Sequence, residues 1–377
     1  MNILLAAMAM DIGGAETHIV GLANELKRIG YKPVVVSSGG IYVEELKKQG
    51  IKHYNAPLNK KDIKSILKSI RILKSVIDKE KIQIIHAHGR IPALNGKILS
   101  SVKGIPFMTT AHAKFTVSLL YKYTSFWGKE VISISEDIKN HLIKEFSVKP
   151  ERITIIPNGI DTDKFNPNLK DMNLKSELNL NEDTLKIVYV SRISGPLAEL
   201  VKLVIEAVKE AYKELNNIEI IIAGDGDRFE EVCRVAEKVN KEFDKNLIHM
   251  LGKRTDIPEI LSIGDLAISV SRSALEAMAC EKPVILAGGE GYMGLLTEDN
   301  MEAAISNNFT GRTSNDNITV EKLKNEILTV LKFGSKERAI ELGQLGREIV
   351  TEKFSVKKMT EKTVEIYKRL LKRSVEK

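Results

Sequence analysis

Short apolar runs rich in β-branched residues alternate with longer segments of helical periodicity along the whole sequence. This alternation predicts βαβ units and parallel sheets, because a parallel strand is covered on both faces and needs a helical crossover to return. Six strands are expected in the first half and five in the second. In chain order they are Asn2–Ala7, Pro33–Val36, Ile82–His86, Phe107–Thr110, Val131–Ser135, Ile153–Ile156, Lys186–Val190, Ile218–Ala223, Leu247–Leu251, Leu266–Ser269 and Val284–Leu286.

The length of 377 residues exceeds what one hydrophobic core usually serves. We therefore predict an α/β chain of two Rossmann-like, doubly wound domains with parallel sheets, residues 1–165 and 166–350, joined by a polar crossing at Asn166–Thr184. Residues 351–377 are expected to form a C-terminal helix that packs back toward the first domain. Ligands bind at the carboxyl edges of such sheets, and we expect the two edges to face each other across a cleft.

Charge and apolar content narrow the possible partners. Residues 1–165 hold 25 Lys and Arg against 15 Asp and Glu, whereas the remainder holds 32 against 35. The excess of positive charge predicts an anionic partner for the first half. Nucleic acid is not expected, because no aromatic–basic interleaving accompanies the charge. No run of eighteen apolar residues occurs, and the apolar start Met1–Met10 lacks the basic n-region and cleavage site of a signal peptide. The chain is therefore expected in the cytoplasm, or peripherally at the inner face of a membrane.

Two glycines, Gly13 and Gly14, separate the first expected strand from a helix expected over Ala15–Ile29. Glycine lets the backbone approach a ligand, and a helix N-terminus offers unpaired N–H groups to an anion. A tight turn without a ligand would use the same pair. The spacing is not G-x-G-x-x-G, which argues against a dinucleotide-dependent dehydrogenase.

Four ordered segments together resemble family 4 (group 1) glycosyltransferases of the GT-B fold. They are Gly13-Gly14-Ala15-Glu16, His86-Ala87-His88, Ile156-Pro157-Asn158-Gly159-Ile160-Asp161, and Leu275-Glu276-Ala277-Met278-Ala279 before Pro283-Val284. Each segment alone is weak evidence, but the order and spacing of all four are specific. The resemblance runs from Met1 to about residue 370.

The resemblance implies sugar-side roles in the first domain. Gly13 and Gly14 would face the donor diphosphate and the reacting sugar. His112, after the fourth strand, would lie beside the transferred sugar, where a neutral imidazole can hydrogen-bond a hydroxyl or stabilise developing charge; capping of the strand end is the alternative. His86 and His88 suit acceptor contact or strand-end packing equally.

In the second domain the resemblance implies that Arg192 grips the donor diphosphate, as a guanidinium with fixed donors can. The lysine that the family usually places five residues later is replaced by Leu197, in a loop about two residues longer. Lys202 is a possible substitute, although a solvated helix position explains it equally.

Glu276, at the expected start of a helix, would accept hydrogen bonds from the ribose hydroxyls. The family's other glutamate, eight residues earlier, is replaced by Ile268. Arg272 and the backbone of Ser273 could hold phosphate instead, and Glu290 in a glycine-rich loop could supply the missing carboxylate.

Lys253 and Arg254 resemble the segment whose backbone reads the base, or they are surface charges. Two Asp-x-Asp segments, Asp225-Gly226-Asp227 and Asp161-Thr162-Asp163, occur where turns are expected, and turn chemistry accounts for them. No C-x-x-C or local Cys/His cluster indicates a metal site. We therefore predict no metal and no cofactor.

Residues 60–81 predict a basic amphipathic helix. Its apolar face is Ile63, Ile66, Leu67, Ile70, Leu73 and Ile77, and eight Lys and Arg surround that face. A surface helix packing on the sheet explains the pattern; attraction to an anionic membrane surface explains it as well.

The resemblance implies transfer of a sugar from a nucleotide-diphosphate donor to a saccharide or lipid-linked acceptor, with retention and without metal. Among the possible donors a UDP-sugar is expected. Two alternatives stay open. One is a nucleotide-sugar epimerase, and the other is a catalytically silent sugar-nucleotide or membrane-binding protein, which the absent lysine and glutamate favour.

Overall fold

The computed structural model describes residues 1–375 except 12, 170–171, 313, 315 and 334–335. The chain forms two compact units. Unit 1 comprises Met1–Gly159 and Phe354–Lys377, and unit 2 comprises Ile160–Lys353. The sequence placed the boundaries at 165 and 350, and Lys170 and Asp171 of the expected crossing lie outside the described residues.

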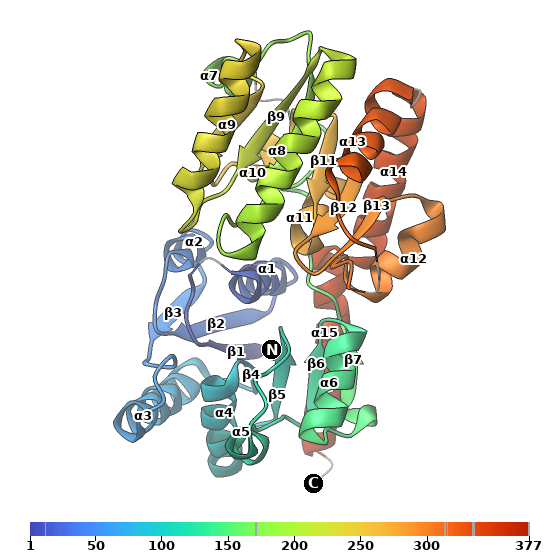
Figure 1. Cartoon of the computed structure of the whole chain (residues 1–377). Helices are drawn as coiled ribbons and strands as arrows, with labels where there is room; N and C mark the ends of the chain where they lie inside the picture. The colour runs from blue at the N-terminus through green and yellow to red at the C-terminus, as the bar shows by residue number, and fades with distance from the viewer. Residues whose placement is uncertain (12, 170–171, 313, 315, 334–335, 376–377) are drawn as a thin grey trace. The chain divides into compact units, whose positions relative to one another are not determined.

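Unit 1 is built on a seven-stranded sheet of order β3-β2-β1-β4-β5-β6-β7. Every neighbouring pair is parallel. The strands are β1 (Asn2–Ala7), β2 (Lys32–Ser37), β3 (Lys52–Asn55), β4 (Ile84–His88), β5 (Phe107–Ala111), β6 (Glu130–Ser133) and β7 (Ile153–Ile155). This is the predicted doubly wound arrangement, with helices on both faces (Figure 1).

The two faces of this sheet carry separate cores, because successive side chains of a strand point to opposite faces. Ile3 and Leu5 of β1 join the core that includes helices α1 (Gly14–Arg28) and α15 (Val356–Val375). Leu4 and Ala6 join the core under α3 (Ile63–Glu80) and α4 (Arg90–Lys103). The strand is therefore apolar from Ile3 to Ala7, as the sequence pattern requires. The remaining helices of the unit are α2 (Tyr42–Lys48), α5 (Leu119–Thr124), α6 (Glu136–Phe146) and the 3-10 turn η1 (Pro150–Arg152).

Unit 2 has a six-stranded sheet of order β10-β9-β8-β11-β12-β13. Its strands are β8 (Leu185–Val190), β9 (Ile218–Ala223), β10 (Ile248–Gly252), β11 (Leu266–Ser269), β12 (Val284–Gly288) and β13 (Gly291–Leu295). Its helices are α7 (Met172–Glu177), α8 (Pro196–Leu215), α9 (Phe229–Phe243), α10 (Ile257–Ser262), α11 (Ser271–Ala279), α12 (Glu298–Ser306), α13 (Val320–Leu328), the π-helix η2 (Thr329–Phe333) and α14 (Lys336–Lys353). The order of the first five strands repeats that of unit 1. In each sheet the chain adds strands first on one side of the first strand and then on the other, with β1 at this switch point in unit 1 and β8 in unit 2.

All eleven expected strands overlap an observed one, but β3 and β13 were not expected. Strand β3 is a short edge strand of sequence Lys-His-Tyr-Asn whose residues are only half-buried or exposed. Strand β13 contains two glycines and pairs antiparallel with β12. Neither resembles the continuous apolar run of a covered parallel strand, which is why the pattern missed them.

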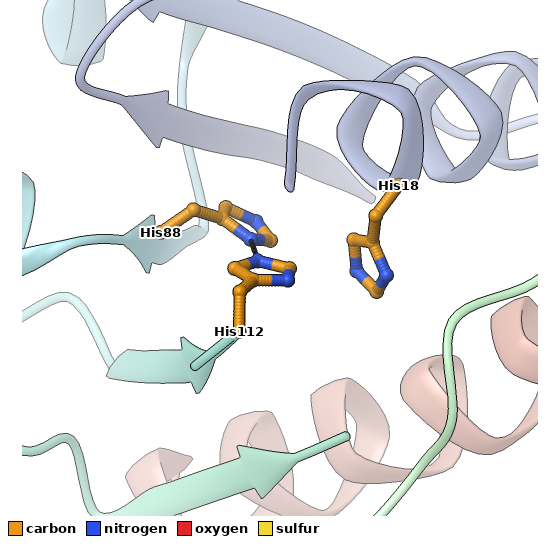
Figure 2. A group of neighbouring side chains, drawn as sticks. All are labelled: His18, His88 and His112. Carbon is orange, nitrogen blue, oxygen red and sulfur yellow. Dashed lines mark hydrogen bonds between the residues drawn. The ribbon is translucent and has the colours of Figure 1, made fainter. Parts of the chain in front are cut away.

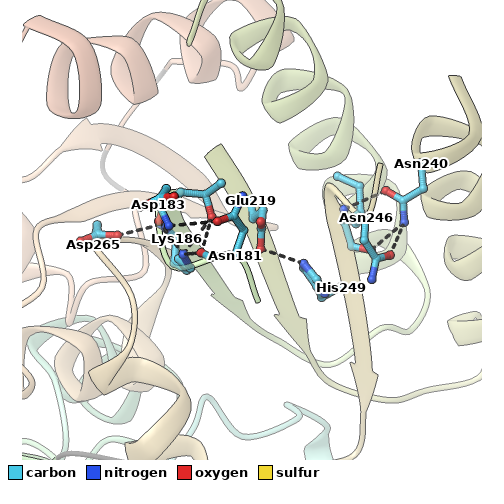
Figure 3. Close-up of polar contacts among 10 residues, drawn as sticks. Asn181, Asp183, Lys186, Glu219, Asn240, Asn246, His249 and Asp265 are labelled. Carbon is cyan, nitrogen blue, oxygen red and sulfur yellow. Dashed lines mark hydrogen bonds and ion pairs between the residues drawn. The ribbon is translucent and has the colours of Figure 1, made fainter. Parts of the chain in front are cut away.

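A buried polar network lies at the amino ends of the central strands of unit 2 (Figure 3). The ammonium of Lys186 donates to the carbonyl and hydroxyl oxygens of Thr184, at 2.5 and 2.8 Å, while the Lys186 N–H donates to Asp265 at 2.7 Å. Glu219 contacts the Nε2 of His249 at 3.0 Å. This network is at the opposite end of the sheet from the carboxyl edge, so we assign it to stability.

In the described part of the chain, no helix combines the length and apolarity needed to cross a bilayer.

Candidate functional site

Four of the seven histidines gather at the carboxyl edge of the unit 1 sheet. His86 and His88 end β4, His112 follows the neighbouring strand β5, and His18 lies in α1. The rings of His18 and His112 meet edge to face at 4.7 Å between centroids, and those of His88 and His112 stack at 5.2 Å. Figure 2 shows His18 of α1 directed toward the two strand-end rings.

Each histidine has a defined polar neighbour. His86 uses both ring nitrogens, which contact the Tyr367 hydroxyl and the Thr110 hydroxyl at 2.7 Å each. Nδ1 of His88 and Nε2 of His112 are 2.9 Å apart. Nδ1 of His18 lies 3.0 Å from the Asn158 amide oxygen; because that oxygen only accepts, Nδ1 carries the proton.

Burial decides the charge state of these rings. It lowers the pKa of His86, His88 and His112 well below the usual value, and the neighbouring imidazoles lower it further. These three rings are therefore neutral at pH 7. A neutral imidazole is the form that the role predicted for His112 requires, whereas the fully occupied ring of His86 favours packing over acceptor contact.

The glycine turn begins α1 as expected. The Gly13 carbonyl accepts from the Thr17 N–H at 3.0 Å, and Gly13 itself is in extended backbone that any residue adopts. A Cβ on Gly13 would lie 2.3 Å from a carboxylate oxygen of Glu16, whereas a Cβ on Gly14 would meet nothing within 4 Å. The space over Gly14 is therefore open to a ligand, and burial raises the pKa of the Glu16 carboxyl beside it.

A second glycine pair, after β2, positions this turn and was not singled out in the sequence. Gly40 has φ +137°, and a Cβ there would lie 2.3 Å from the carbonyl carbon of Met10. The Met10 N–H donates to the Gly39 carbonyl at 2.7 Å. The loop between β1 and α1 is thus held against the end of β2 by direct backbone contact, which only glycine permits.

The corresponding loop of unit 2, after β8, carries Arg192. Its backbone is tied to the loop after β9, since Ile193 donates to the Asp225 carbonyl at 3.0 Å. A Cβ on Gly224, which has φ +157°, would lie 1.8 Å from the Ser191 carbonyl oxygen. The Arg192 side chain is exposed, and its guanidinium makes no hydrogen bond or ion pair with any residue that the structure describes. It is available for an anion.

The structure corrects the position of Glu276, which lies in the middle of α11 and not at its start. Its carboxylate accepts from Nε of Arg272, one turn earlier, at 2.8 Å. Burial raises the pKa of Glu276, and the Arg272 charge opposes that rise. The sequence named both residues without linking them, although the i, i+4 spacing was the signal. The Ser273 hydroxyl donates to the Val270 carbonyl at 2.8 Å, and the Val270 N–H lies 3.4 Å from the same hydroxyl, so this side chain is held against the backbone at the start of α11.

Two of the three other predicted donor residues have protein partners. Arg254 forms ion pairs with Glu177 and Asp256, whereas Lys253 is exposed. Glu290, in the turn between β12 and β13, pairs with Arg312. It borders a hollow of about 580 Å³ lined by the Gly288–Gly291 turn, α8 and residues 314–318 among the described residues.

The two Asp-x-Asp segments form turns. Asp161 accepts from the N–H groups of Asp163 and Lys164, at 3.1 and 3.0 Å, and Asp225 accepts from the Gly226 N–H at 2.8 Å. These are the short-range contacts of Asx turns, as the sequence predicted.

Family models match both units. Residues 12–164 match the family described as Glycosyltransferase Family 4, and residues 171–345 match Glycosyl transferases group 1. The chain belongs to the family 4 (group 1) glycosyltransferases. The resemblance drawn from the four ordered segments is thereby confirmed.

Relatives and solved structures agree with this family and with its GT-B fold. A UDP-Gal:alpha-D-GlcNAc-diphosphoundecaprenol alpha-1,3-galactosyltransferase of Escherichia coli is 30% identical over 61% of this chain and 63% of its own length, less than two thirds of that relative. A glycosyltransferase structure from Rickettsia africae has a TM-score of 0.80 at 24% identity, covering 98% of this chain and 99% of that one. HepE of Anabaena, solved with UDP and glucose, has a TM-score of 0.73 at 18% identity, with 98% and 99% covered.

Within the family, the two departures of this glycosyltransferase have structural reasons. Ile268 is fully buried inside β11, paired with Tyr189 of β8, so a carboxylate at that position would lie in the core. Leu197 packs in the first turn of α8 toward Gly289. Lys202 forms ion pairs with Glu199 and Glu231, so the suggestion that it replaces the missing lysine is not supported.

Proposed function

We propose that the protein transfers a sugar from a UDP-sugar to a saccharide or lipid-linked acceptor, with retention and without a metal on the donor. The observation that carries the donor half is the charge at the carboxyl edge of unit 2. Arg192 follows β8 and the Arg272–Glu276 pair follows β11, and these strands are neighbours in the sheet. Two guanidiniums and a half-buried carboxylate therefore follow adjacent strand ends, where such sheets bind nucleotides.

The donor chemistry follows from those groups. Arg192 and Arg272 would neutralise the diphosphate as the sugar leaves, together with backbone amides of the first turn of α11. The Glu276 carboxylate would accept from the ribose hydroxyls. The UDP donor named for the E. coli relative and the UDP bound by HepE support a uridine nucleotide.

Unit 1 supplies the acceptor half of the proposal. His112 would hydrogen-bond the transferred sugar or stabilise charge on it, and the open space over Gly14 would admit the ligand. His88, 5% exposed, borders the same cluster. A diphosphoundecaprenol-linked acceptor is named for the E. coli relative, which supports a lipid-linked substrate here.

Helix α3 offers a membrane contact consistent with such an acceptor. Its C-terminal half packs into unit 1 through Leu73 and Ile77, but Ile63 and Leu67 of its first turns are 76% and 61% exposed. Lys60, Lys61, Lys64, Lys68 and Arg71 around them are exposed as well. Apolar side chains inside a basic patch suit an anionic lipid surface.

This membrane contact is tested by co-sedimentation with phosphatidylglycerol vesicles. The double substitution Ile63→Ser/Leu67→Ser should weaken co-sedimentation, whereas Ile340→Ser, a control at another exposed site, should not. Equal sedimentation of all three proteins would contradict this contact.

Donor binding is tested by calorimetric titration of UDP, GDP and ADP. We expect UDP to bind most tightly, and Glu276→Gln to weaken it roughly tenfold or more, because a hydrogen bond to a charged group is lost. Arg338→Gln is the matched control, since Arg338 is a surface arginine paired with Glu298 on α12. Undiminished UDP binding by Glu276→Gln, or preference for GDP or ADP, would contradict the proposal.

The silent-binder alternative has one observation in its favour, because Lys202 is held in ion pairs and Glu276 already has an arginine partner. Turnover separates the three functions. A transferase releases UDP from a UDP-sugar only as the acceptor is glycosylated, an epimerase isomerises the donor without releasing UDP, and a silent binder does neither.

A further inference from the structure

Three of the clustered histidines are arranged as metal ligands. One ring nitrogen from each of His18, His88 and His112 lies within 4.8 Å of the other two (Figure 2). We propose that these three side chains bind a divalent transition-metal ion, Zn²⁺ above all, within unit 1. The site shares His88 and His112 with the sugar contacts proposed for unit 1, where the Nδ1 of His112 stays free of the ion, and it does not depend on the donor chemistry proposed for unit 2.

The ring nitrogens already approach each other about as closely as ligands of one ion do. With Zn–N bonds of about 2.0–2.1 Å, the nitrogens of a tetrahedral site are roughly 3.3 Å apart. The Nδ1 of His88 and the Nε2 of His112 are 2.9 Å apart. His18 supplies the third nitrogen, within 4.8 Å of the other two, from a ring whose centroid lies 4.7 Å from that of His112.

Two further observations point to a ligand. The Nε2 of His88 and the Nδ1 of His112 are buried and have no hydrogen-bond partner within the described part of the chain. With the facing nitrogens of the two rings on the ion, these outer nitrogens carry the ring protons. Buried N–H groups are rarely left without an acceptor, so a molecule bound at the site is expected to accept from them. The Asn158 oxygen meanwhile contacts the Nδ1 of His18, so the ring proton is on Nδ1 and the lone pair is on Nε2. Metal-binding histidines usually have such a partner on the other ring nitrogen.

The chemistry of the group selects the kind of metal. The described residues that meet the distance are three imidazoles, without a carboxylate. Nitrogen ligands suit Zn²⁺, Co²⁺, Ni²⁺ and Cu²⁺, whereas Mg²⁺ and Ca²⁺ require oxygen ligands. The site is therefore unsuited to the hard cations that serve diphosphates, and it leaves the metal-free donor proposal intact. Three protein ligands leave a fourth position open to water.

His86 shows why the site has three members and not four. Both of its ring nitrogens are occupied, by the hydroxyls of Tyr367 and Thr110, so it has no lone pair to give. It packs beneath His88 with the ring centroids 4.2 Å apart. The ion would join α1, β4 and β5, and should stabilise unit 1 by mass action.

The test is Co²⁺ titration of the chelator-treated full chain, followed by absorption in the visible region. We expect one Co²⁺ per chain with the intense bands of four-coordinate geometry, displacement by Zn²⁺, and no competition from excess Mg²⁺. His18→Asn, His88→Gln and His112→Gln should each weaken Co²⁺ binding by roughly 100-fold, the upper end of what loss of a metal-site contact costs. His53→Gln and His141→Gln, which remove histidines outside the cluster, should not change it.

Folding is checked separately, because the cluster is buried. Each variant is melted with chelator present, and its UDP titration is repeated. Zn²⁺ should raise the Tm of the native chain and of His53→Gln but not that of His112→Gln, while His18→Asn should still bind UDP. The proposal is overturned if the native chain binds no stoichiometric Co²⁺ or Zn²⁺, or if the cluster variants bind as tightly as the native chain. Such a result would leave the UDP titration, and with it the proposed transfer, standing.

Discussion

The two units share a strand order but differ in the chemistry of their carboxyl edges. At the edge of unit 1 are neutral imidazoles, whose burial opposes charge. At the edge of unit 2 are an exposed arginine and a half-buried arginine–glutamate pair. The same topology therefore presents a neutral hydrogen-bonding surface in one unit and a charged surface in the other. Fold alone assigns neither role, and the difference in side chains is what divides the proposed acceptor and donor functions.

The two units also share a close contact between the loops that follow their first and second strands. In each, a glycine after the second strand contacts the backbone of the loop after the first strand: Gly40 against Met10 in unit 1, and Gly224 against Ser191 in unit 2. These loops carry the glycine turn and Arg192. The scaffold of the two edges is thus alike, although the functional side chains are not.

The largest effect on activity is expected from substitution of Arg192 in unit 2. Arg192→Ala should lower kcat/KM roughly 100- to 1,000-fold, because a preorganised charge on the leaving diphosphate is lost. UDP affinity should fall as well. Steady-state turnover and UDP titration measure both effects, with Arg338→Ala as the control. A change below threefold in kcat/KM would show that unit 2 does not hold the diphosphate through this residue.

A substitution in unit 1 should separate the two roles. His112→Ala, assayed with chelator present, should lower kcat roughly 10- to 100-fold through loss of a contact to the sugar. It should leave the Kd for UDP unchanged, because UDP is assigned to unit 2. Parallel loss of UDP affinity would contradict the division between the units.

The glycine contacts predict a matched loss of stability. Gly40→Ala and Gly224→Ala should each destabilise the chain by about 2 kcal/mol, since the added Cβ would overlap backbone and both positions have positive φ. Urea unfolding measures this loss. Gly14→Ala is the control, because a Cβ there meets nothing within 4 Å. A cost at Gly14 equal to that at Gly40 would contradict the proposed role of close approach.

The smallest expected effect concerns the buried network of unit 2. Burial opposes ionisation of Glu219, but the hydrogen bond from His249 and the charge of Lys186 outweigh it and lower the pKa of Glu219. The contribution of the ionised Glu219 to the free energy of unfolding is therefore present above the ordinary pKa of a glutamate and is lost as the pH falls through the lowered value. Glu219→Gln should cost about 1 kcal/mol at pH 7 and nothing at low pH. Unfolding measured from pH 7 to pH 3 tests this; a constant difference would contradict it.

Much of the fold could be predicted, because covered parallel strands leave continuous apolar runs such as Ile218–Ala223. The family motifs likewise placed His112, Arg192 and Glu276 at strand ends or in the helix that follows one. The contacts that complete the sites were missed, since they join distant parts of the chain. Tyr367 meets His86 across 281 positions, and Asn158 meets His18 across 140. No local pattern encodes such pairs.

Two omissions did have a local signal. The Gly39-Gly40 pair directly after a β-branched run indicated a turn that only glycine can make. The four-residue spacing of Arg272 and Glu276 on one helix indicated an ion pair. The metal ligands had no such signal, because His18, His88 and His112 become neighbours only when β4 and β5 pair and α1 packs beside them.

The assignment of UDP binding to unit 2 and of the sugar contacts to unit 1 is tested most directly by hydrogen exchange of the full chain with and without UDP. UDP should protect the loop after β8 and the first turn of α11, which hold Arg192 and Arg272, and Glu276→Gln should reduce that protection. The histidine-bearing ends of β4 and β5 should exchange as they do without UDP. Protection confined to unit 1, or none at the two unit 2 loops, would contradict the account.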